Sequence, residues 1–212
     1  MDQLFSTYIE TSDVSRLRRG KSQIEDCNSE VQAIWELCLK AKELTEGAFD
    51  PWKVSGGFDP SGYVKGWAAD RALKILKEHG AVSAQVNAAG DISLFGGTYE
   101  DRVHKPWSIG IRHPDDPKTI VKVFEIMDGA IATSGTYERG SHIIDPFTGT
   151  IAIGARSATV LGPEGGIAEA LATALIVAGK DGAKWFTKPE LAGYSAWVIE
   201  RHSDQAWGIN LK

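Results

Sequence analysis

Residues 163–178 read Pro-Glu-Gly-Gly-Ile-Ala-Glu-Ala-Leu-Ala-Thr-Ala-Leu-Ile-Val-Ala. Small and aliphatic side chains cover nearly the whole circumference of the helix that this stretch predicts, so we expect it to be buried on most sides. Glu169 and Thr173 are its polar exceptions. Because they are four residues apart, both project from one face of the helix.

Two further helices are predicted from apolar residues that recur at helical spacing, over residues 28–44 and from residue 61 or 62 to residues 79–80. Gly47 is expected to end the first of these helices. Lys65 falls in the first turn of the second helix. A cation at this positive end of a helix is unfavourable unless an anion binds there too.

Short runs rich in β-branched, aliphatic and aromatic residues read as strands. They are residues 84–86, 92–95, 107–111, 120–126, 158–161, 196–199 and 207–209. Several of them follow one another with no helix between, which indicates antiparallel pairing. We therefore expect an α+β fold and not a doubly wound parallel sheet.

The composition favours one globular unit. The chain has 212 residues, of which 42% are hydrophobic, and no repeat or linker divides it, so we expect a single domain over residues 1–212. Its formal net charge of -5 argues against nucleic acid as a partner, and the basic run at residues 16–21 is expected to form a solvated surface turn. Cys27 and Cys38 lack the spacing of a metal site or redox pair, which predicts reduced thiols.

The location is predicted from what the sequence starts with. The longest apolar run is far shorter than a membrane span, and Asp2 and Gln3 follow Met1 where a leader would have basic and then apolar residues. As written, the sequence predicts a cytoplasmic protein with no membrane span.

One histidine lies among hydroxyl and glycine residues. Thr133-Ser134-Gly135 is followed by Ser141-His142-Ile143-Ile144-Asp145-Pro146-Phe147-Thr148-Gly149, which has the composition of a catalytic loop. The imidazole of His142, with Asp145 near enough to orient it, suits general-base work near neutral pH. A surface or structural histidine is the alternative, and we expect that role for His79, His104, His113 and His202.

Two other segments have the composition of a phosphate site. Residues 59–66 read Asp-Pro-Ser-Gly-Tyr-Val-Lys-Gly, where glycine permits close backbone approach and lysine supplies a point charge. A plain helix start is the alternative. Residues 87–91 read Asn-Ala-Ala-Gly-Asp, for which a β-turn is the alternative.

Glu169 and Thr173 together offer oxygen ligands for a hard cation. A buried carboxylate needs a partner. The alternative to a metal is a salt bridge from Glu169 to a neighbouring arginine, with Thr173 bonded to its own helix backbone.

The segments at 59–66, 87–91, 133–149 and 168–173, in this order and spacing, resemble those of the FAD:protein FMN transferases, the flavin-attaching enzymes also called the ApbE family. Phe5-Ser6-Thr7-Tyr8 and Ser12-x-x-Ser15-Arg16-Leu17 resemble the family's N-terminal segment. The resemblance covers residues 5 to about 179. It implies tandem T-fold-like halves, in which antiparallel sheets pack with helices.

The resemblance also implies roles for individual residues. His142 would be the catalytic residue, required for FMN transfer. FAD would be bound by Tyr8, which lies against the flavin in the family, and by Asp59, Lys65, Gly90, Asp91, Ser134, Gly135 and His142. Mg2+ would be held by the backbone carbonyl near Gly62 and by the side chains of Glu169 and Thr173, and Mn2+ is the other metal considered.

The chain departs from the family pattern in three places. Glu169 replaces an aspartate, and its greater length shifts the carboxylate at a metal that tolerates little distortion. Ala89 replaces a glycine. Members normally carry further residues before the Phe-Ser-x-Tyr segment, so we expect an N-terminally shortened domain. Either another chain, as in a homodimer, or a rearranged element covers the sheet edge, or Met1 is not the natural start.

The function implied by the resemblance is metal-dependent transfer of FMN from FAD to a Thr or Ser hydroxyl of a target protein, with release of AMP. Two alternatives remain. An FAD pyrophosphatase would use water as the nucleophile at the same site and give FMN and AMP. A non-catalytic protein would bind FAD and leave it intact.

Overall fold

The computed structural model describes residues 1–100, 103–135 and 143–211. Its helices are α1 (Asp2–Phe5), α2 (Asp13–Arg18), η1 (Ile24–Asp26), α3 (Ser29–Leu44), α4 (Ser61–Glu78), α5 (Gly165–Ala178), η2 (Gly179–Thr187) and η3 (Pro189–Leu191). Its strands are β1 (Ala84–Ala88), β2 (Asp91–Phe95), β3 (Thr98–Glu100), β4 (Val103–Lys105), β5 (Trp107–His113), β6 (Asp116–Ile126), β7 (Gly129–Gly135), β8 (Ala155–Gly162), β9 (Ser195–Glu200) and β10 (Ala206–Ile209). Within these residues, no helix has both the length and the hydrophobicity that crossing a bilayer requires.

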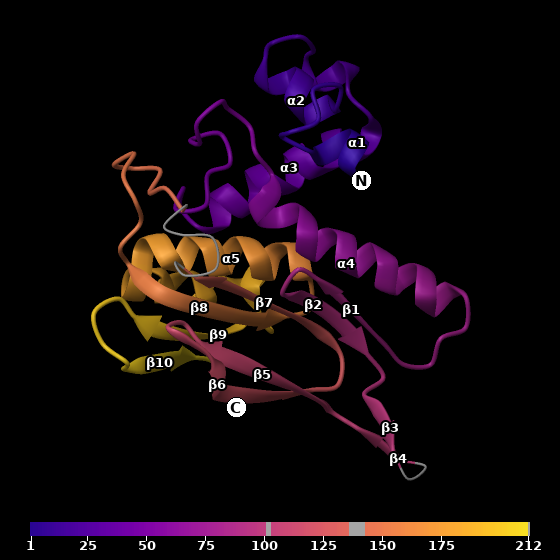
Figure 1. Ribbon diagram of the computed structural model, residues 1–212, viewed down its shortest axis with the longest axis vertical. Helices are drawn as coiled ribbons and strands as arrows, with labels where there is room; N and C mark the ends of the chain where they lie inside the picture. The colour runs from indigo at the N-terminus through magenta and orange to yellow at the C-terminus, as the bar shows by residue number, and fades with distance from the viewer. Residues whose placement is uncertain (101–102, 136–142, 212) are drawn as a thin grey trace.

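A six-stranded sheet in the order β1-β2-β7-β8-β9-β10 forms the centre of the molecule. Every neighbouring pair in it is antiparallel. Figure 1 shows α5 lying across β7 and β8, with α4 beside it over β1 and β2. In the part of the chain that the structure describes, β5 and β6 form a separate two-stranded sheet, which lies on the opposite side of the central sheet from the helices. The α+β fold predicted from the sequence is confirmed.

The strands divide their side chains between two cores. Ala132 of β7 and Val160 of β8 pack with the helices, whereas Ile131 faces the β5–β6 hairpin together with Leu94. Since successive side chains of a strand point to opposite faces, one strand supplies both cores. The sheet is therefore buried on both sides in its middle, and the helix α5 is fixed against it.

The three helices predicted from periodicity are confirmed as α3, α4 and α5, and all seven predicted strands are present. One prediction is wrong: Thr133, Ser134 and Gly135 do not belong to a loop but end strand β7, paired with β8. Strand β7 contains few large or β-branched residues. The alanine-rich helix α5 packs close against this strand, so there is room for small side chains only. The hydroxyl groups are therefore held by a sheet.

The basic run at residues 16–21 is not simply a solvated turn. Arg18 ends α2, and its guanidinium donates to the carbonyl oxygens of Gly57 at 3.1 Å and Phe58 at 3.2 Å. It also lies 3.7 Å from the carboxylate of Asp59. Arg18 thus ties the N-terminal helices to the segment that leads into α4.

Glycines let α4 and α5 cross at very short range. A Cβ atom on Gly66 of α4 would lie 2.2 Å from the carbonyl oxygen of Gly165, the first residue of α5. At the same crossing, Asp70 of α4 accepts a hydrogen bond from the Gly165 amide at 2.7 Å and one from the Ser93 hydroxyl at 2.5 Å. Burial raises the pKa of Asp70, although both hydrogen bonds lower it. The crossing therefore fixes the positions of the neighbouring side chains on both helices, Lys65 on α4 and Glu169 on α5.

Replacing Gly66 with alanine is expected to lower the free energy of unfolding by about 1–3 kcal/mol, since the added methyl group forces two backbones apart. Glycine-to-alanine changes at open positions in a helix have the opposite sign and stabilise by up to about 1 kcal/mol. Urea unfolding of the purified variant measures the difference. A variant more stable than wild type would contradict the proposed tight crossing.

Candidate active site

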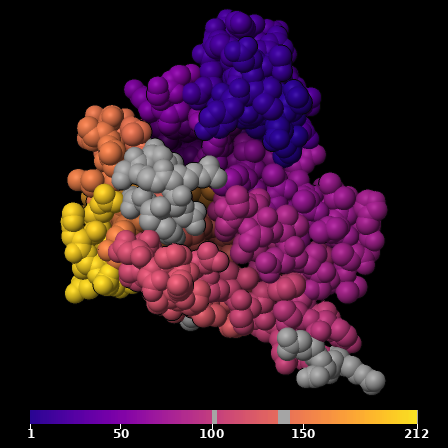
Figure 2. Space-filling view, viewed as in Figure 1, coloured from indigo at the N-terminus to yellow at the C-terminus, as the bar shows by residue number. Residues whose placement is uncertain are grey.

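A cleft of about 250 Å³ lies where α4, α5 and the end of β7 meet. Its lining comes from six separate parts of the chain: Ala48, Phe49, Asp50, Pro51, Val54, Asp59, Ser61, Gly62, Lys65, Ala89, Asp91, Thr133, Ser134, Gly135, Ile143, Ile144, Glu169 and Thr173. On the face drawn in Figure 2, the orange segment after residue 142 stands beside violet residues that precede α4. A Cβ atom on Gly47 would lie 3.6 Å from the ring of Phe147, so the two segments touch.

Eight of the predicted site residues line this one cleft, namely Asp59, Gly62, Lys65, Asp91, Ser134, Gly135, Glu169 and Thr173. The predicted catalytic residue, His142, and its neighbour Ser141 lie outside the described residues. Ile143 and Ile144, which follow His142 directly, are part of the lining. The motifs selected from the sequence therefore converge in space.

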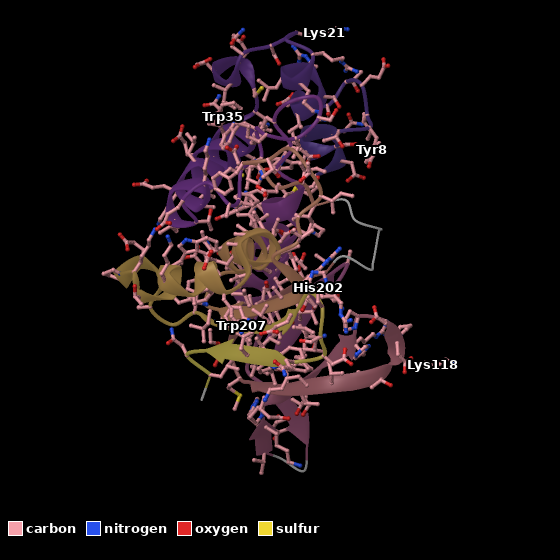
Figure 3. All side chains as sticks on the ribbon, turned by 90° about the vertical axis from the view of Figure 1, so that its left-hand side faces the viewer. Tyr8, Lys21, Trp35, Lys118, His202 and Trp207 are labelled. Atoms are coloured by element: carbon pink, nitrogen blue, oxygen red, sulfur yellow. The ribbon has the colours of Figure 1, made fainter. Side chains whose placement is uncertain are left out.

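Tyr8 is not in the lining that the structure describes. It lies between α1 and α2 with 94% of its surface exposed, and Figure 3 shows it at the outside of the N-terminal helices. Its contact with a flavin stays a prediction from the resemblance.

Gly90, also absent from that lining, has a conformational role. Ala88 pairs with Asp91, so Ala89 and Gly90 form a two-residue hairpin turn with φ values of 55° and 105°. Positive φ at both positions is typical of a type I′ turn. Asn87 Oδ1 accepts a hydrogen bond from the Gly90 amide at 2.8 Å. The β-turn expected as an alternative is confirmed, and at position 89 an alanine in place of glycine costs about 1–2 kcal/mol.

The ammonium group of Lys65 lines the cleft and lies between two carboxylates. Lys65 Nζ is 3.1 Å from Asp91 Oδ2, is in contact with Glu169 Oε1, and donates to the Ser61 carbonyl oxygen at 3.0 Å. Lys65 is placed by the first turns of α4, Asp91 by the start of β2, and Glu169 by α5. Three elements distant in sequence thus share one ion cluster.

Glu169 has two partners, as its burial requires. Besides Lys65, its Oε2 accepts a hydrogen bond from the Gly66 amide at 2.9 Å. A salt bridge was the alternative expected for this carboxylate, and the structure has one, but to a lysine and not an arginine. The hydroxyl of Thr173 forms a hydrogen bond with the hydroxyl of Ser134 at 3.1 Å, which links α5 to the end of β7.

The oxygen atoms near Thr173 are of the type that a hard cation prefers as ligands. The hydroxyls of Thr173 and Ser134 are in contact, and a Cβ atom on Gly62 would lie 3.6 Å from Thr173 Oγ1, so this glycine's backbone is close. Glu169, one helical turn earlier on α5, contributes the carboxylate. Among the described residues, no group of three or more His, Cys, Asp and Glu side chains could bind a metal. A metal here would depend on hydroxyl and backbone oxygens and on one carboxylate that now faces Lys65.

Among the described residues that line the cleft, negatively charged side chains outnumber positively charged ones. Four carboxylates line it, whereas Lys65 is the lining's cation within the described part of the chain. Lys42 pairs with Asp50 at 2.7 Å, and Arg18 approaches Asp59, both from outside the lining. An anionic ligand would therefore bind poorly without additional positive charge.

Apolar side chains make up another part of the lining. This apolar wall comprises Ala48, Phe49, Pro51, Val54, Ile143 and Ile144, and an aromatic ring system could pack against it. Phe49, Asp50 and Pro51 also line the cleft, although they are not among the site residues predicted from the sequence. A signal for them was present, because Phe-Asp-Pro occurs at residues 49–51 and again at residues 58–60.

The other four histidines behave as expected for structural or surface residues. His79 bonds the Ile75 carbonyl within its helix end, His104 bonds the Gly96 carbonyl, and His113 lies 3.5 Å from Asp204. His202 is exposed in the connection between β9 and β10. None of the four lines the cleft as far as the structure describes it.

Comparison with known proteins agrees with this geometry. A family model described as "ApbE family" matches residues 53–197. An FAD:protein FMN transferase of Vibrio cholerae is 38% identical over 133 residues, which cover 58% of this chain and 39% of that protein. One of Rhodobacter capsulatus is 37% identical over 131 residues, covering 58% and 24%. The chain spans between 24% and 41% of the length of the curated relatives it matches.

Two solved structures share the fold over almost the whole chain. The ApbE protein of Thermotoga maritima has a TM-score of 0.84 at 25% identity, covering 98% of this chain and 84% of that one. The flavin transferase ApbE from Vibrio cholerae has a TM-score of 0.82 at 25% identity, covering 99% and 84%. The family model matches more than half of the chain and includes Asp59, Lys65, Glu169 and Thr173. This chain belongs to the ApbE family.

Proposed function

We propose that this protein is a metal-dependent FAD:protein FMN transferase, which attaches FMN to a Thr or Ser hydroxyl of an acceptor protein and releases AMP. The single observation that carries the proposal is the convergence of eight motif residues, from the segment before α4 and from α4, β2, β7 and α5, on one cleft. Support also comes from relatives named FAD:protein FMN transferase.

The apolar and the polar lining residues suit different parts of such a substrate. The apolar wall of Phe49, Val54 and Ile143 offers contact area for an isoalloxazine ring. Lys65 and the hydroxyls of Ser134 and Thr173 offer donors to a pyrophosphate. Because four carboxylates share the lining, a divalent cation would reduce the repulsion that a pyrophosphate meets.

In the proposed reaction, the acceptor hydroxyl oxygen forms a bond to the FMN-side phosphorus, and the bond from that phosphorus to the oxygen bridging to AMP breaks. The hydroxyl proton passes to the imidazole of His142, and AMP leaves with the bridging oxygen. Gly62, Glu169 and Thr173 would hold Mg2+, or Mn2+ in its place, which when bound supplies positive charge to the phosphate oxygens. The ammonium of Lys65 would add to that charge.

The reaction is tested by incubating the purified protein with FAD, Mg2+ and a candidate acceptor, then analysing nucleotides and acceptor mass. Transfer is expected to give acceptor carrying FMN together with an equal amount of AMP. Free FMN with AMP would show a pyrophosphatase, and intact FAD would show a binding protein.

Riboflavin should bind at least about tenfold more weakly than FAD, since Lys65 and the metal act on the phosphates. Equal affinities of the protein for riboflavin and FAD would contradict the phosphate contacts.

A further inference from the structure

Three protein oxygens surround the Lys65 ammonium group. The ammonium donates hydrogen bonds to the Ser61 carbonyl at 3.0 Å and to Glu169 Oε1, and it forms an ion pair with Asp91 Oδ2 at 3.1 Å. A lysine has three donors and no more. In this arrangement two of the donors are engaged and the ammonium also lies beside Asp91, so it is directed at protein oxygens although the Lys65 side chain is 35% exposed.

The two carboxylates around the ammonium are almost fully enclosed. The side chain of Asp91 is 6% exposed and that of Glu169 is 3% exposed. Enclosed carboxylates are costly without positively charged partners, and the Lys65 ammonium contacts both of them. A divalent cation carries twice the charge of the ammonium and can therefore compete with it for Glu169.

Glu169 is built so that one of its oxygens can change partner while the other stays bound. Oε2 is held by the Gly66 amide at 2.9 Å, and Gly66 is fixed by its close contact with Gly165. Oε1 faces the mobile end of a lysine. Exchange of the cation at Oε1 therefore needs movement of the Lys65 side chain and no movement of either helix.

We infer that Lys65 is a tethered cation that competes with the divalent metal for Glu169. Without metal, the ammonium holds Glu169 and Asp91. When a divalent cation takes Glu169, the ammonium is released and its donors turn to the pyrophosphate of the incoming dinucleotide. Metal binding thus prepares the phosphate site, so that the metal and FAD bind with positive coupling. This inference rests on the proposed function for the identity of the dinucleotide only.

The competition predicts opposite effects of Lys65→Met on two affinities. Mn2+ alone, titrated without nucleotide and followed by electron paramagnetic resonance of the free ion, is expected to bind at least about tenfold tighter than to wild type, because its competitor is gone. FAD at saturating Mn2+ is expected to bind at least about tenfold more weakly. Lys65→Arg keeps a positive charge and should leave the Mn2+ affinity near that of wild type. Unchanged or weaker Mn2+ binding by Lys65→Met would overturn the inference.

Lys42→Met is the matched control. It removes the partner of Asp50, a buried carboxylate of the same cleft, without touching Lys65 or Glu169. Its Mn2+ affinity should equal that of wild type. An equal gain in Lys42→Met and Lys65→Met would show a general charge effect and would also overturn the inference.

A wild-type measurement covers the case in which Lys65→Met does not fold. Acetylation of lysine side chains is followed by mass spectrometry with and without Mg2+, in the absence of FAD. Mg2+ is expected to increase the labelling of Lys65 severalfold, because the amine leaves its carboxylates, and to leave Lys42 unchanged. Labelling of Lys65 that does not respond to Mg2+ would contradict the exchange. Both measurements omit FMN transfer, so failure of the proposed reaction and failure of the exchange are distinguishable.

Discussion

Replacing His142 with alanine is expected to lower the rate of FMN transfer by about 100-fold to 10,000-fold, the usual contribution of a general base. The affinity for FAD should be nearly unchanged, since proton transfer from the acceptor hydroxyl occurs in the transition state and not in the complex with FAD. Acceptor mass followed over time gives the rate, and quenching of flavin fluorescence gives the affinity. His142 is predicted for this role from its place in the Ser-His-x-Ile-Asp-Pro-x-Thr-Gly block.

His202→Ala is the control for that variant. His202 is exposed between β9 and β10 and is not in the cleft lining. Its loss should leave both transfer and FAD affinity at wild-type values. Wild-type transfer by His142→Ala would remove the assignment of this imidazole as the base, and a matching loss of FAD affinity would make it a binding residue.

Replacing Glu169 with alanine is expected to reduce transfer by at least about 100-fold and to abolish its dependence on Mg2+, because the proposed site loses its carboxylate. The same change leaves the buried Gly66 amide without its acceptor and the Lys65 ammonium with one carboxylate fewer. A buried N–H group without an acceptor lowers the free energy of unfolding by about 1–3 kcal/mol. Activity over a Mg2+ titration and urea unfolding measure the two effects.

Two milder variants separate charge from packing at position 169. Glu169→Gln keeps an oxygen for the Gly66 amide but has no charge, so its stability should be near wild type while transfer still falls. Glu169→Asp, with a shorter reach to Lys65, should raise transfer at low Mg2+. If Glu169→Gln keeps the wild-type Mg2+ dependence, the carboxylate is a structural partner of Lys65 and the metal site lies elsewhere or does not exist.

The sequence by itself determined the elements whose pattern is local. The apolar residues of α3 and α4 recur at helical spacing, and α5 is apolar on nearly every side, so each could be located before any packing was known. The resemblance to the ApbE family pointed to Asp59, Lys65, Glu169 and Thr173 as site residues, and their i, i+4 spacing placed Glu169 and Thr173 on one face of a helix.

Only the tertiary structure decided which of these residues meet. Strand β7 could not be located from the sequence, because its small residues suit the neighbouring α5 and have no strong strand propensity of their own. Lys65 and Glu169 are 104 residues apart, and their contact exists because Gly66 and Gly165 allow two helices to cross at backbone distance. Spacing along a chain limits which face of an element a side chain occupies, whereas the partner across the cleft depends on long-range packing. The site's residue types were therefore readable from the sequence, and their ion pairs were set by the fold.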